Sequence, residues 1–177
     1  MSAYAFGPEG GRLTVRTGRG GAVAKAGHDL LIEVTRWSAT LRLGDRPSVE
    51  LEADPRSLRV LEGTGGISAL DDDDKAGIAR TIDEEILKGA PIVFRSTSVD
   101  ARDHALAVRG DLELAGVRRP VDFALELAGD GHVTGSARVK QTDWRIKPFS
   151  ALFGTLKVAD LVEVAIDAEP TRSEDRG

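Results

Sequence analysis

Hydrophobic and polar residues alternate along most of this chain, a period of two that is typical of strands with one buried face. Early runs of this kind lie at 13–15 and 30–34. The pattern then shifts by one position near Thr35 and Arg36, so that the next apolar residues fall at odd positions in 37–43. We predict a β-bulge there, because one extra residue keeps both halves of the strand facing the same interior.

Further alternating runs bring the number of expected strands to about eight. They lie at 49–53, 58–60, 92–98, 106–114, 121–127, 133–139 and 162–166. Eight antiparallel strands can close into a barrel, which leaves no exposed sheet edge and is either filled by side chains or holds one small ligand. We therefore predict an all-β, eight-stranded antiparallel barrel as a single domain over 1–170. The charged residues 171–177 are predicted to form a disordered tail.

One segment departs from this rhythm and predicts a helix. Its apolar residues recur at the spacing of a single helical stripe: Ile78, Ile82, Ile86 and Leu87. The acidic run 71–74 favours a helix N-terminus, and Gly89 with Pro91 ends the pattern. The sequence thus predicts one inserted α-helix at about 73–88.

Composition and charge narrow the possible functions. The 177 residues are 41 % hydrophobic, enough for one domain with a sizeable core. The net charge of −5 argues against a nucleic-acid partner, and the absence of cysteine excludes disulfides and thiolate metal sites. No run approaches the roughly 18 apolar residues of a spanning helix, so we expect no stable membrane insertion. The first residues show no secretory signal pattern, and we expect a cytoplasmic location.

Several segments, taken together, resemble the YceI-like family. They lie at 24–37, 91–99, 108–121 and 141–164, and their order and spacing fit the family from about Arg12 to Ala168. The resemblance implies a lipocalin-like barrel of eight antiparallel strands with a helix packed against it. It also implies a long internal pocket for polyisoprenoid chains, such as the tails of isoprenoid quinones, and for similar amphiphiles.

The main hypothesis is therefore a binding protein, not an enzyme, that needs no cofactor or metal. Its expected ligand is an elongated apolar molecule, such as a polyisoprenoid, an isoprenoid quinone tail or a fatty chain, held by burial of apolar surface. For the large apolar residues within strands, such as Trp37, Phe94 and Phe123, packing in the core is the default role and pocket lining is the functional one. The candidate ligand-binding residues are His28, Leu30, Ile32, Val34, Trp37, Phe94, Leu112, Phe123, Val139, Trp144, Phe149, Phe153 and Val164.

His28 is the one histidine that invites a functional role. It follows Gly27 at the head of an apolar strand and matches a histidine of the family that the chain resembles. Its ring could contact a ligand head group, or it could tie down a neighbouring loop. The chain has no nucleophile-elbow motif and no metal-ligand spacing. An enzyme that uses His28 with Asp143 is therefore the weakest hypothesis.

A loop with three large apolar residues leaves one alternative open. Phe149, Leu152 and Phe153 lie close together between Pro148 and Gly154. Large apolar side chains in one loop are expected to pack against another surface, either the mouth of the barrel or a second copy of the chain. The rival hypothesis is thus a filled barrel that acts as a structural or interaction protein, as a homodimer without a ligand.

Overall fold

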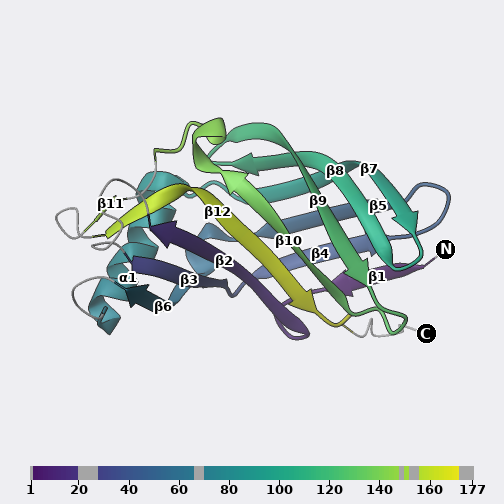
Figure 1. Ribbon diagram of the computed structural model, residues 1–177, viewed down its shortest axis with the longest axis horizontal. Helices are drawn as coiled ribbons and strands as arrows, with labels where there is room; N and C mark the ends of the chain where they lie inside the picture. Colours follow the sequence, from purple (N-terminus) through teal and green to yellow (C-terminus); the bar gives the residue numbers. More distant parts are fainter. Residues whose placement is uncertain (1, 20–27, 66–69, 148–149, 152–155, 172–177) are drawn as a thin grey trace.

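Antiparallel strands make up most of the structure, a computed structural model that describes residues 2–19, 28–65, 70–147, 150–151 and 156–171 (Figure 1). Every pairing between these strands is antiparallel. In chain order the strands are β1 (Ala3–Phe6), β2 (Gly11–Arg19), β3 (His28–Val34), β4 (Trp37–Arg42), β5 (Ser48–Ala53), β6 (Leu58–Gly65), β7 (Ile92–Arg102), β8 (Ala105–Leu114), β9 (Val117–Leu127), β10 (Val133–Lys140), β11 (Ser150–Ala151) and β12 (Leu156–Ala168).

The strand order closes the sheet on itself. Neighbours follow the path β1-β4-β5-β7-β8-β9-β10-β12-β2-β3-β6. β1 pairs with β4 and β4 with β5, while β2 pairs with β3 and β3 with β6. The six labels are therefore the halves of three long, bent strands: β1 with β2, β3 with β4, and β5 with β6. The path therefore begins and ends in the same three strands. The predicted eight-stranded antiparallel barrel is confirmed, and the larger number of labels arises because these three strands are divided and β11 has only two residues.

The bend between β3 and β4 lies where the sequence pattern shifts. Thr35 N donates to Ser57 O at 3.0 Å, and Asp54 N donates to Arg36 O at 3.0 Å. These hydrogen bonds connect the bend to the 3₁₀ turn Pro55–Ser57, which joins β5 to β6. Val34 and Trp37 are both buried on the two sides of the shift. Both halves of the strand thus face the interior, as the sequence predicted, but Thr35 and Arg36 form a break between β3 and β4 and not the predicted β-bulge.

The inserted helix lies at the end of the barrel away from β1 (Figure 1). Helix α1 (Asp72–Thr81) begins with a reciprocal cap, in which Asp74 N donates to Asp71 Oδ1 at 2.7 Å and Asp71 N donates to Asp74 Oδ2 at 3.2 Å. Within the described residues, no helix has the length and hydrophobicity needed to cross a membrane.

The second half of the predicted helix is a π-helical turn, η2 (Ile82–Ile86), and not α-helix. Leu87 N donates to Ile82 O at 2.8 Å, the wider spacing of that turn. Because Ile86 and Leu87 follow Ile82 by four and five residues, a wider turn brings both to the face that packs on the barrel. The expected range 73–88 is therefore corrected to an α-helix with a π-helical end.

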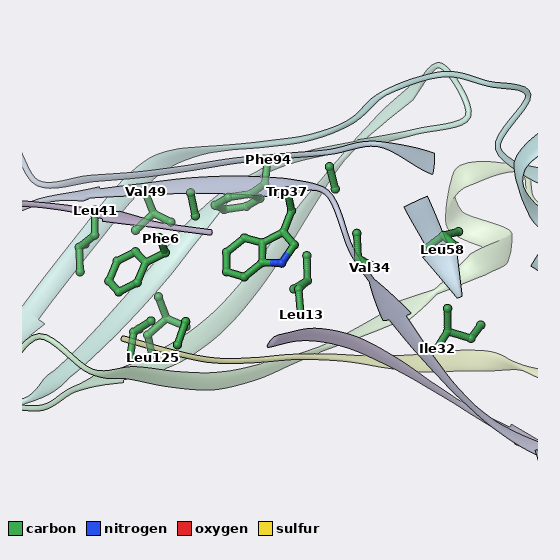
Figure 2. Close-up of a cluster of buried hydrophobic side chains, with 14 of the residues drawn as sticks. Phe6, Leu13, Ile32, Val34, Trp37, Leu41, Val49, Leu58, Phe94 and Leu125 are labelled. Carbon is green, nitrogen blue, oxygen red and sulfur yellow. The ribbon is translucent and has the colours of Figure 1, made fainter. Parts of the chain in front are cut away.

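The interior holds one large hydrophobic cluster and a small second one. In the large cluster, Phe6, Trp37 and Phe94 project inward from different strands (Figure 2). The rings of Phe94 and Phe123 lie 5.1 Å apart at 60°, a favourable tilted pair. In the half of the barrel away from α1, four side chains are at most 2 % exposed: Leu106, Val108, Val133 and Ala168.

Candidate ligand-binding cavity

The barrel encloses an apolar cavity of about 260 Å³. This volume is close to the lower end of the roughly 300–1,000 Å³ of small-molecule pockets. The lining runs from Leu41 and Val49 near β1 to Ile82 and Ile86 of η2, so the cavity extends along the barrel. None of the described residues that line it is charged. The alternation that forms the strands therefore also lines the cavity, and the interior is not filled.

Most of the candidate residues that the structure describes line this cavity. They are Leu30, Ile32, Val34, Phe94, Leu112, Phe123, Val139 and Val164. Trp37 and Trp144 are 6 % and 3 % exposed, but they pack in the hydrophobic clusters and do not line the cavity. His28 is the first residue of β3, and its side chain, like Phe149 and Phe153, lies outside the described part of the chain. Asp143 is exposed.

Several residues that line the cavity in the half of the barrel nearer to the helix are only partly buried. They are Leu112, Val121, Phe123, Val162 and Val164. At the opposite end, Leu106, Val108, Val133 and Ala168 are almost wholly shielded from solvent.

The wall of the barrel opens between β9 and β10. These strands pair only where Val133–Ser136 face Leu127–Ala124. Beyond that point β9 continues to pair with β8, and β10 with β12, without any described pairing between β9 and β10. The 3₁₀ turn η3 (Gln141–Trp144) lies against β9 and β12 at this opening. Its Trp144 forms the second hydrophobic cluster with Val139 and Ile146.

Hydrogen bonds hold η3 in place. Arg119 Nε donates to Asp143 O at 3.0 Å. Thr142 donates to both carboxylate oxygens of Asp160, from its backbone N at 2.8 Å and from its hydroxyl at 2.6 Å. The Thr142 hydroxyl is the main reason why the pKa of Asp160 lies below its ordinary value; backbone N–H groups and the charge of Lys140 lower it further, against a smaller rise from burial.

Sequence reasoning missed several cavity residues. Ile82 and Ile86 line the cavity, although the sequence predicts for them only a helical stripe. Thr17 also lines the cavity, and the signal for it was present, because it follows Leu13 and Val15 at the same period of two. Gln141 lines the cavity from η3, where no strand pattern could reveal its direction.

Comparison with known proteins gives the family. The family model that describes the YceI-like domain matches residues 30–170. The chain belongs to the YceI-like family. No curated protein sequence matches it.

Solved structures of similar fold come from several bacteria. BcnA of Burkholderia cenocepacia has a TM-score of 0.66 at 15 % identity, over 91 % of this chain and 96 % of that one. A polyisoprenoid binding domain from Saccharophagus degradans has a TM-score of 0.58 at 10 % identity, over 95 % and 98 %. The YCEI protein of Campylobacter jejuni has a TM-score of 0.56 at 14 % identity, over 81 % and 85 %. At these identities the similarity shows that the YceI-like chain shares the fold.

Proposed function

We propose that this YceI-like protein binds an elongated apolar molecule, such as a polyisoprenoid or a fatty chain, inside its barrel without transforming it. The observation that carries this proposal is the apolar cavity that extends along the barrel, whose described lining residues carry no charge. Removing a hydrocarbon chain from water contributes about 25 cal/mol per Å² of apolar area, before the cost of ordering the chain. The similar fold of a polyisoprenoid binding domain supports the choice of ligand.

The rival role as a filled barrel receives less support, because the interior contains free space. The loop that would form a homodimer surface includes Phe149 and Phe153, which lie outside the described residues. The homodimer and the cytoplasmic location therefore stay predictions. The pairing of His28 with Asp143 in an enzyme has no geometric support, because the Asp143 side chain is exposed and only its backbone oxygen has a described bond.

The test is to identify what the protein carries and to block the cavity. Organic extraction of natively purified protein, followed by mass spectrometry, is expected to release a long-chain apolar molecule. Ala137 lines the cavity, whereas Ala124 is exposed on β9 and does not line it. Ala137→Phe is therefore expected to remove most of the extracted ligand, and the matched Ala124→Phe to leave its amount unchanged. An empty wild-type protein that also fails to bind added isoprenoids would overturn the proposal.

A further inference from the structure

Basic side chains gather around the opening between β9 and β10. Residues 117–121 of β9 and 138–147, from β10 through η3, contain six basic residues and one acidic residue, in a chain whose net charge is −5. All six basic residues are exposed, and we call them the basic patch: Arg118, Arg119, Arg138, Lys140, Arg145 and Lys147. The negative charge of the whole chain therefore hides a local excess of positive charge at this opening.

The contacts of η3 bring the two basic segments together. Arg119 Nε donates to Asp143 O at 3.0 Å, which joins the start of β9 to η3. Arg119 also pairs across the sheet with Leu112, whose backbone oxygen accepts the hydrogen bond from Trp144 Nε1. The same turn ends at Arg145. The basic residues of β9 and those that flank η3 thus belong to one surface.

Acidic neighbours offset only part of this charge. Arg118 Nη2 lies 3.8 Å from Glu113 Oε2, Glu163 lies opposite Arg138 in the pairing of β10 with β12, and Asp160 accepts hydrogen bonds from η3. A second acidic region is α1 with η2, which contains six acidic and two basic residues. This helix packs on β6, which β12, β2 and β3 separate from β10 in the strand order. Charges of opposite sign are therefore separated across the barrel, which orients the molecule in an electric field.

The basic patch borders the lining of the cavity. Val121 on β9 and Val139 on β10 line the cavity on the two sides of the opening, and Ile146 lines it just after η3. Along β10, Arg138 and Lys140 flank Val139, so the charges lie on the outer face where the apolar residue lies on the inner one. The positive charge is thus placed at the part of the wall through which the cavity is nearest to an opening.

We infer that the basic patch docks this protein on the surface of a membrane that contains anionic lipids, with the opening between β9 and β10 toward the lipid. This inference rests on the proposed function, because a long apolar ligand dissolves in a bilayer and not in water. Each Lys or Arg near an anionic bilayer strengthens binding, and the guanidinium of Arg matches the geometry of phosphate groups. Nucleic acids also offer phosphates, but they hold no apolar ligand, so the position of the patch beside the cavity favours the membrane.

Co-sedimentation of the full-length protein with vesicles tests the inference. At about 50 mM salt, wild-type protein is expected to bind vesicles of phosphatidylcholine with about 30 % phosphatidylglycerol and not vesicles of phosphatidylcholine alone. Raising the salt to about 500 mM is expected to release it, because salt screens surface charges. The combined variant Arg138→Gln, Arg145→Gln and Lys147→Gln is expected to weaken binding to the anionic vesicles at least about tenfold.

The matched control removes the same amount of charge away from the opening. It replaces exposed arginines of β4, of the loop that follows β4 and of the turn Pro55–Ser57: Arg42→Gln, Arg46→Gln and Arg56→Gln. This variant is expected to bind the anionic vesicles within about twofold of the wild type. Equal weakening by the two triple variants, equal binding to neutral vesicles, or binding to heparin without binding to vesicles would overturn the membrane assignment.

Ligand binding is measured separately, so that the docking surface and the proposed function can fail independently. Both triple variants are expected to keep the wild-type affinity for the neutral dye Nile red, because none of the replaced residues lines the cavity. This measurement also shows that the variants fold. Wild-type protein that binds the dye but no anionic vesicles would overturn the docking surface while the proposed function stands. Protein that binds the vesicles but neither the dye nor farnesol would overturn the proposed function instead.

Discussion

The indole nitrogen of Trp144 donates a hydrogen bond to the backbone oxygen of Leu112, 2.8 Å away. The bond joins the turn that follows β10 to β8, across the region where β9 and β10 no longer pair. Trp144 is 3 % exposed there and packs against Val139 and Ile146. This one side chain thus replaces part of the missing strand pairing in the wall of the barrel.

Trp144→Phe is expected to lower the free energy of unfolding, measured with urea, because it removes that hydrogen bond and some ring volume. The matched control is Trp37→Phe, since Trp37 is also buried and its Nε1 has no hydrogen-bond partner within the described residues. The loss at Trp144 should exceed the loss at Trp37 by about 1 kcal/mol, the contribution of one buried hydrogen bond. Equal losses would show that the bond to Leu112 contributes nothing.

The lowered pKa of Asp160 predicts a loss of stability in acid. An unfolded aspartate titrates at about pH 3.9, and in the folded protein the pKa of Asp160 is lower. Its stabilising contribution is therefore present above about pH 4 and is lost as the pH falls through the folded value. Asp160→Asn is expected to flatten the dependence of the unfolding free energy on pH below about pH 4.

Thr142→Val supplies the control for this assignment, because the Thr142 hydroxyl is the largest cause of the shift. Titration of the Asp160 carboxyl by NMR is expected to give a higher pKa in this variant than in the wild type. An unchanged pKa would contradict the role given to Thr142 in holding η3.

Gly110 is expected to tolerate no side chain. A Cβ at this position of β8 would lie 2.6 Å from Phe94 Cζ and 2.7 Å from Ser96 Cα. Gly110→Ala is therefore expected to destabilise the protein by about 1–3 kcal/mol in urea unfolding, the usual cost of overpacking. Gly129→Ala has nothing within 4 Å of its Cβ and is expected to stay within about 0.5 kcal/mol of the wild type. Similar values for the two variants would contradict this difference in packing.

The sequence predicted the fold because alternation records which face of each strand is buried. It located the shift at Thr35 and Arg36 and eight of the residues that line the cavity, including Phe94 and Val164. Alternation does not record how far two strands remain paired. The opening between β9 and β10 was therefore missed, and with it the position of Trp144 outside the cavity. The π-helical turn was missed because spacings of four and five both fit a stripe that includes Ile86 and Leu87.

The bend between β3 and β4 also limits how the length of the chain can vary. Deleting one residue at Thr35 or Arg36 would reverse the faces of the whole following strand and turn Trp37, Ala39 and Leu41, now at most 9 % exposed, toward water. A deletion in the loop 43–47 between β4 and β5 would leave those faces unchanged. Insertions and deletions are thus tolerated between the strands of this barrel and forbidden inside its bent ones, where odd changes in length exchange inside for outside.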